Sequence, residues 1–200
     1  KDATQTFTVK AAGATITVNG QSYNDVAENI PYDAKVTVSK TGTTSWRVGD
    51  VVVAYGDTYS FFCGSNMELT AVTDAGDATV KTQVAIASTD RPSASKPDVL
   101  FIATRIVADG ETVVSQGFVY GKNAVASDLT LENVGKTASG ANAGKVKVAY
   151  NSTNSDQFGL NYAIKAMTGT AAARAFIVTK DADGNVKTTY SEASLYNYDA

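Results

Sequence analysis

The chain of 200 residues has no histidine and a single cysteine, Cys63. Without histidine it lacks the commonest general base and a frequent metal ligand. A lone cysteine forms no disulfide within the chain and has no histidine to activate it as a nucleophile, so we expect Cys63 to be a small buried core residue. These absences favour a binding or architectural protein over an enzyme, and we predict no catalytic residues, no metal ligands and no cofactor.

Charge is also scarce. Only 18% of the residues are charged, the net charge is -3, and the isoelectric point is about 4.9. No run of lysine or arginine suggests a groove that follows phosphates, which argues against a nucleic-acid partner. No apolar stretch approaches the roughly 20 residues that a membrane helix needs, so we expect no membrane insertion. The chain opens at Lys1 without a signal peptide, and we expect a mature piece of a longer protein.

Alternating apolar and polar residues around short turns dominate what is present. Two stretches, 46–61 and 173–190, carry this pattern on both sides of a glycine-containing turn. Such alternation is typical of antiparallel hairpins with one face buried. Asn19-Gly20 is a strong hairpin signal, because both residues adopt positive φ at low cost. The sequence therefore predicts an all-β fold.

The pattern divides into two lobes with a polar junction at residues 73–78. We predict a β-repeat or small sandwich lobe at 1–76 and a sandwich lobe at 77–200. In the first lobe, 6–10 and 15–18 are expected as two strands joined by a turn at 11–13. In the second lobe, 161–167 is expected as a strand. The long stretch from Gly121 to Gly144 is expected as a functional or mobile loop.

Two family likenesses appear in these segments. Residues 46–72 resemble the tandem β-repeats on surface proteins of Gram-positive bacteria. Residues 113–121 and 173–191 look like inner strands and the last hairpin of fibronectin type III or immunoglobulin-like sandwiches from gut bacteria. The two-lobed arrangement is also similar to starch-adherence modules of Ruminococcus-type surface complexes. This resemblance implies an extracellular or cell-surface location, an α-glucan ligand, and neighbouring domains of a larger surface protein as further partners.

Aromatic residues are the best candidates for a ligand surface. The chain has 18 of them, ten of which are tyrosine. An aromatic ring packs against the flat C–H face of a sugar, and a tyrosine hydroxyl stays wet while the ring binds. Core positions are expected for the phenylalanines that alternate in phase with valine and isoleucine, and Trp46 has a competing interpretation as the core aromatic of its repeat. The predicted ligand-binding residues are Trp46, Tyr55, Tyr23 and Tyr32.

The acidic residues give weaker signals. Asp181, Asp183 and Asn185 resemble part of a calcium loop, but alternating strands flank them and a hairpin turn is the better interpretation. Most acids lie in turns, where a facing pair of the kind that glycosidases need is not expected. We therefore predict a non-catalytic carbohydrate-binding module. The alternatives are a structural spacer or adhesion domain of a surface protein and, third, a hydrolase.

Overall fold

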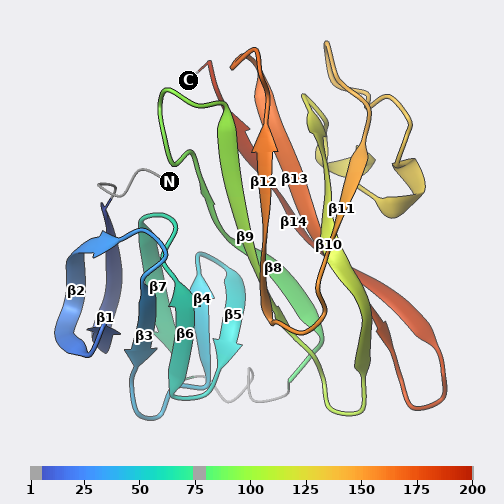
Figure 1. The fold of residues 1–200 in the computed structure, drawn as a ribbon. Coiled ribbons are helices and arrows are strands. Elements are labelled where there is room, and N and C mark those ends of the chain that lie inside the picture. Colours follow the sequence, from blue (N-terminus) through green and yellow to red (C-terminus); the bar gives the residue numbers. More distant parts are fainter. Residues whose placement is uncertain (1–5, 74–79, 200) are drawn as a thin grey trace. The chain divides into compact units, whose positions relative to one another are not determined.

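The computed structural model describes residues 6–73 and 80–199, and within them the chain is all-β, as predicted (Figure 1). The helical segments in this described part are two short 3-10 turns, η2 (Ala126–Asp128) and η3 (Leu131–Asn133). The chain forms two compact units, Lys1–Lys81 and Thr82–Ala200. The predicted lobe boundary between residues 76 and 77 lies outside the described residues.

The first unit is one seven-stranded sheet in the order β5-β4-β7-β1-β3-β6, with β2 also paired to β1. Most neighbours are antiparallel, whereas β1 and β7 run parallel. The strands are β1 (Thr6–Val18), β2 (Gln21–Pro31), β3 (Lys35–Ser39), β4 (Ser45–Val48), β5 (Val51–Tyr55), β6 (Thr58–Phe62) and β7 (Met67–Val72).

Strand β1 organises this sheet. It is one continuous strand of 13 residues, so the predicted pair of strands with a turn at 11–13 is wrong. The pairing with β2 shifts register between Ala11 and Thr15, and the Asp25 carboxylate accepts the Gly13 N–H at 2.6 Å. A bulge of this kind bends the strand, which lets its first half pair with β7 and its second half with β3. The predicted Asn19-Gly20 hairpin is confirmed: both residues have positive φ, and they join Val18 to its partner Gln21.

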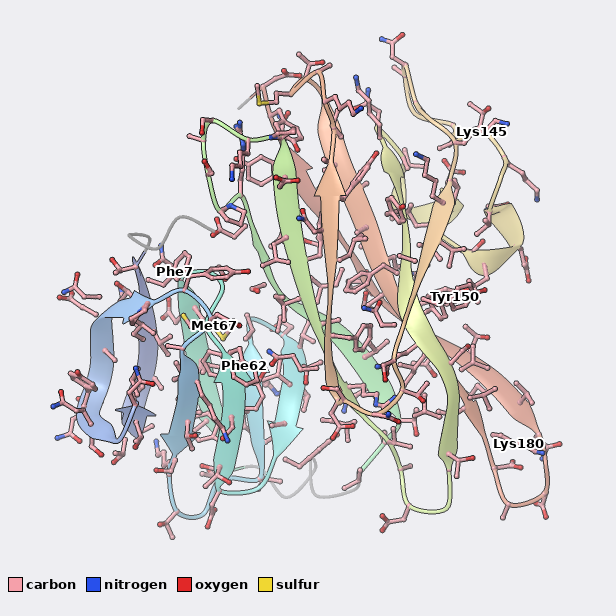
Figure 2. The ribbon with its side chains drawn as sticks, viewed as in Figure 1. Phe7, Phe62, Met67, Lys145, Tyr150 and Lys180 are labelled. Atoms are coloured by element: carbon pink, nitrogen blue, oxygen red, sulfur yellow. The ribbon has the colours of Figure 1, made fainter. Side chains whose placement is uncertain are left out.

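The core of the first unit is built from the inward residues of these strands. Phe7 on β1 and Met67 on β7 are buried at one end of the sheet (Figure 2). Cys63 is also buried, and its Sγ donates to the Ser65 carbonyl at 3.5 Å, which confirms the prediction of a core cysteine. Other fully buried members are Val9, Ile16, Ile30, Val36, Val38 and Trp46.

The second unit is a sandwich of two antiparallel sheets, one of four strands (β11-β10-β13-β14) and one of three (β12-β9-β8). Consecutive strands cross between the sheets, since β9 and β10, and likewise β12 and β13, belong to different sheets. The strands are β8 (Gln83–Asp90), β9 (Asp98–Ile106), β10 (Thr112–Lys122), β11 (Lys147–Asn151), β12 (Gln157–Ala163), β13 (Thr170–Lys180) and β14 (Val186–Asn197).

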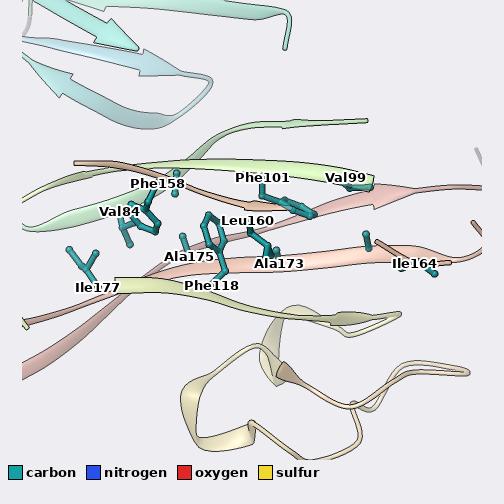
Figure 3. Packing of buried hydrophobic residues seen from close by; sticks show 12 residues of the cluster. Val84, Val99, Phe101, Phe118, Phe158, Leu160, Ile164, Ala173, Ala175 and Ile177 are labelled. Carbon is teal, nitrogen blue, oxygen red and sulfur yellow. The ribbon is translucent and has the colours of Figure 1, made fainter. Parts of the chain in front are cut away.

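Large and small side chains complement one another between the two sheets (Figure 3). Phe118 meets Phe158 edge-on, with ring centroids 5.4 Å apart. Strand β13 contributes small inward residues, Ala171, Ala173 and Ala175, each fully buried. Ala173 pairs with Tyr120 on one side, and the small side chain leaves room for the half-buried tyrosines packed against this core.

Two expectations for the second unit need correction. Residues 123–146, between β10 and β11, form a packed cover over the outer face of the four-stranded sheet: Leu129 is fully buried there, against Val119, Val146 and Phe176. This packing corrects the mobile part of the expectation of a functional or mobile loop. Strand β12 ends at Ala163 and a turn follows, where the Met167 N–H donates to the Ile164 carbonyl at 2.8 Å, so 161–167 is only partly strand.

Candidate functional site

A hollow of about 310 Å³ lies beside β2 and contains one of the predicted tyrosines, Tyr23. The ring of Tyr23 is 38% exposed, and its hydroxyl donates to Oε1 of Gln21 at 3.3 Å. The alternation of β2 puts both side chains on the same face of the sheet. Their register partners on β1, Ile16 and Val18, lie on that face too. The hollow is lined by Val18, Asn19, Gln21, Tyr23, Glu28, Asn29, Ile30 and Pro31.

This lining combines an apolar floor with groups that form hydrogen bonds. Val18, Ile30 and Pro31 supply the apolar part, and Asn19, Gln21, Glu28 and Asn29 supply amides and a carboxylate. Asn19 and Asn29 both have positive φ, so the turn and an irregular step in β2 place these two residues at the rim. An aromatic face next to several donors and acceptors is the arrangement that fits a polyhydroxylated ligand.

A second, longer hollow crosses the opposite face of β1, β2 and β7. Its two parts measure about 520 and 420 Å³ and share Lys10 and Glu68. Lys10 is the direct sheet neighbour of Glu68 and of Val26, so these three side chains stand in one row. The Asn66 amide oxygen accepts the Thr8 N–H at 2.9 Å at one end of this groove. The described residues that line the groove include polar groups of both signs and no aromatic side chain.

Glu28 joins the two hollows, because it lines both the space beside Tyr23 and the groove around Lys10. It lies where the β1–β2 register shifts between Phe7 and Val9, so strict alternation of faces breaks down at this point. Glu28 therefore borders both hollows.

The other predicted ligand residues are placed differently. Trp46 is completely buried, and its indole N–H donates to the Gly56 carbonyl at 3.0 Å. A ring without an accessible face does not stack on a ligand, so we leave Trp46 out of the candidate surface and assign it to the core. Tyr32 is half-buried against Phe7, with ring centroids 6.4 Å apart, and Tyr55 is half-buried at the end of β5. Neither residue lines the hollows around Tyr23 and Lys10.

Sequence reasoning missed the polar residues around the two hollows. Lys10, Glu28 and Glu68 look like ordinary outward residues of alternating strands, and nothing in their spacing distinguishes them. Lys10 and Glu68 come together because β1 pairs in parallel with β7, a contact between segments almost 60 positions apart in the chain. Asn19 and Gln21 were within reach of prediction, since the Asn19-Gly20 turn fixes their place beside Tyr23.

The described carboxylates that line the hollows do not form an acid–base pair of the kind that a glycosidase uses. Glu28 and Glu68 line one hollow, but both are exposed, and a general acid at neutral pH needs a desolvated carboxyl. Burial raises the pKa of Asp90, which lies on β8 of the other unit.

The Asp181 loop is the hairpin turn that was predicted. The Asp181 carboxylate accepts hydrogen bonds from the Asn185 side chain at 2.9 Å and the Asn185 backbone N–H at 2.8 Å. These bonds lower the pKa of Asp181. Among the residues that the structure describes, no group of three or more histidine, cysteine, aspartate or glutamate side chains is placed to hold a metal ion.

Two further observations bear on the class of protein. In the described part of the chain, no helix is both long and apolar enough to cross a membrane. Comparison with the models of known protein families gives no match, and comparison with curated proteins gives none either.

Proposed function

We propose that this protein is a non-catalytic carbohydrate-binding module of the cell surface or extracellular space, and that its first unit binds the sugar at Tyr23. The observation that carries the proposal is a 38% exposed tyrosine lining a hollow of about 310 Å³ together with side-chain amides and a carboxylate. On the strength of the resemblance to starch-adherence modules, the proposed ligand is an α-glucan such as starch.

In this proposal, different residues bind different parts of the sugar. The ring of Tyr23 packs against the C–H face of one pyranose, and the apolar floor next to it excludes water. Asn19, Gln21 and Asn29 donate to and accept from the hydroxyls at the rim of that sugar. Glu28 lies between this sugar and the next one. The hydroxyls of the next sugar form hydrogen bonds with Lys10, Asn66 and Glu68 in the longer groove. The protein provides no bond-breaking group in this scheme, so the ligand leaves unchanged.

A site of this kind is weak by itself. One ring and a few exposed hydrogen bonds support a dissociation constant between micromolar and millimolar, or roughly -8 to -4 kcal/mol. Display of several sites on one polymer raises the effective affinity without new contacts. Weak single sites are therefore compatible with firm attachment to an insoluble glucan.

For the second unit we propose a fibronectin type III or immunoglobulin-like sandwich. The support is its split into antiparallel sheets of three and four strands, with connections that cross between them. Such a unit serves as a scaffold or spacer between domains as readily as it binds, which keeps the adhesion or spacer role as the main alternative for the whole chain.

The test is retention of the full chain on granular starch, cellulose and xylan, with Tyr23→Ala beside the parent. We expect retention on starch and a loss of about thirtyfold in affinity for the variant, since truncation of a central aromatic costs about 2 kcal/mol. Tyr23→Phe keeps the ring and is expected to retain most of the binding.

Phe62→Ala is the matched control, because Phe62 is a 51% exposed aromatic of the same unit that lies outside both hollows (Figure 2). Equal losses for Tyr23→Ala and Phe62→Ala would count against a site at Tyr23. Absence of retention on every polysaccharide would overturn the proposal and put the spacer or adhesion role first. Trp46→Ala is unsuitable as a control, since removing a fully buried tryptophan costs about 3–5 kcal/mol of stability.

A further inference from the structure

A row of residues crosses all four strands of the larger sheet of the second unit. Tyr150 on β11 pairs with Gly117 on β10, Gly117 pairs with Phe176 on β13, and Phe176 pairs with Tyr190 on β14. Residues directly opposite one another share a face of the sheet. This face is the outer one, because Phe176 and Tyr190 belong to the cluster under the 123–146 cover and not to the core between the sheets.

Gly117 leaves the row without a side chain on β10. A Cβ at this position would lie 2.0 Å from the Ala149 carbonyl oxygen, so no side chain fits between β10 and β11. The rings of Tyr150 and Phe176 lie only 5.8 Å apart at 89°, although their strands are two intervals, about 9.6 Å, apart. The two rings therefore lean toward each other over Gly117, and the contact with the buried ring of Phe176 holds Tyr150 in place.

The members of the row differ sharply in exposure. Phe176 is fully buried, whereas Tyr150, on β11, is 65% exposed. Figure 2 labels the place of Tyr150. Tyr190 is half-buried and already engaged: its hydroxyl accepts the Leu131 N–H at 3.0 Å, and the Arg174 guanidinium lies 4.8 Å from its ring centroid. Tyr150 is thus the one ring of this row that offers a broad accessible face.

We propose that Tyr150 is a second sugar-binding position of this protein, a flat platform on the second unit that takes one pyranose of a polysaccharide. Phe176 contacts the edge of the Tyr150 ring, and Gly117 is a positioning residue, because its lack of a side chain leaves room for that contact. The inference shares its ligand class with the proposed site at Tyr23 and rests on that function for the choice of polysaccharide, but it uses different residues.

The size of the platform favours a sugar over a protein partner. One aromatic ring covers at most about 150–250 Å², whereas a stable protein interface needs about 800 Å² on each side. The other residues of the row add little, because Gly117 and Phe176 are buried and Tyr190 is half-buried. A pyranose ring matches the accessible face, and the Tyr150 hydroxyl stays in contact with water at its edge.

Two binding positions on two units increase the retention of the protein on a polymer. Binding at the second position becomes intramolecular once the first is engaged, so retention on a long glycan exceeds what either position supports by itself. Short soluble oligosaccharides, which engage one position at a time, do not show this gain.

The experiment titrates the full chain with a soluble malto-oligosaccharide and follows backbone amide resonances by NMR, beside retention on granular starch. We expect two separate sets of shifted resonances, one around residues 19–31 and one around Gly117, Tyr150 and Phe176. Tyr150→Ala is expected to remove the second set only and to reduce retention on starch by about tenfold or more. Leu195→Ala, a 59% exposed aliphatic residue on β14 of the same sheet, is the matched control and should change neither.

The outcomes separate the two proposals. Shifts around 19–31 without any around Tyr150 would overturn the platform and leave the proposed function standing. Shifts around Tyr150 without any around 19–31 would establish the platform and remove the site at Tyr23. Equal retention by Tyr150→Ala and the parent would overturn the platform as a contributor to attachment. Tyr150→Phe, which keeps the ring, should bind like the parent, and a loss as large as that of Tyr150→Ala would contradict stacking.

Discussion

Arg105 is a buried charge that ties three parts of the second unit together. Its guanidinium donates to the Gln116 side chain, to the Thr153 carbonyl at 2.8 Å, and to the Asp156 carboxylate at 3.1 Å. Gln116 is itself fully buried, and its amide donates to the carbonyls of Ser152 and Ser155. The pair therefore holds the 152–156 turn against β9 and β10.

We expect Arg105→Met to destabilise the protein by about 2–4 kcal/mol, because it leaves the buried oxygen of Gln116 and the Thr153 carbonyl without their donor. Asp156→Asn is the matched control: its side chain is 80% exposed, so losing that ion pair should cost about 1 kcal/mol or less. Urea unfolding measures both. A larger loss for Asp156→Asn than for Arg105→Met would show that the ion pair, and not the buried amide network, stabilises the turn.

Tyr162 is a half-buried tyrosine whose pKa is raised. Burial, with smaller contributions from Tyr120 and Tyr198, raises its pKa to about 12 from the ordinary value of 10.0. The folded state thus holds this proton more tightly than the unfolded state does. The resulting stabilisation is complete below about pH 10 and is lost as the pH rises toward 12.

Tyr162→Phe keeps the ring that packs edge-on against Tyr120, at 4.8 Å between centroids, and removes the phenol. We expect the variant to lack one late-ionising phenol in an ultraviolet titration and to lose less stability between about pH 10 and 12. An unchanged high-pH end of the titration would assign the late ionisation to another tyrosine.

At the scale of elements, the close approach of β10 and β11 depends on one glycine. Gly117→Ala is expected to weaken this pairing and destabilise the second unit by about 1–3 kcal/mol, since its Cβ would overlap the Ala149 carbonyl. Gly144→Ala is the control, because its Cβ would have its nearest neighbour, the Lys122 Cβ, at an ordinary 3.7 Å. Chemical denaturation compares them, and equal midpoints would mean that β11 moves aside without cost.

The elements also show what could be predicted from the sequence. Alternation identified the strands, and the Asn19-Gly20 and Asp181–Asn185 turns were identified from local chemistry that works within four or five residues. The 123–146 cover could not be predicted in this way. Its order comes from contacts such as Leu129 with Phe176 and from the Asp128 carboxylate, which accepts the Ser139 N–H at 2.7 Å, and none of these has a periodic signal.

In the candidate sites, too, local features could be predicted from the sequence and long-range contacts could not. Tyr23 was predicted as a ligand residue because it is an aromatic residue close to a turn, and its place beside Asn19 and Gln21 follows from that turn. The role of Tyr150 depends on register across β11, β10 and β13, which a single sequence does not fix. Trp46 shows the converse, since the same aromatic composition that suggests stacking also fills a core.

At the scale of the whole molecule, each unit has its own sheets and its own buried core. The single tryptophan of the chain, Trp46, belongs to the core of the first unit. Its fluorescence therefore reports on the unfolding of that unit, while amide resonances of β9 and β13 report on the other. This separation allows the cooperativity of the chain to be measured with the protein intact.

We expect the two reporters to follow different transitions when one core is weakened. Arg105→Met should lower the denaturant midpoint seen at β9 and β13 and leave the Trp46 transition in place. Ile16→Val, which removes one methylene from a fully buried side chain of the first unit at a cost of about 0.5–1.5 kcal/mol, should shift the Trp46 transition alone. If either variant moved both transitions by the same amount, the units would unfold as one cooperative body, and binding at Tyr23 and at Tyr150 would have to be treated as coupled.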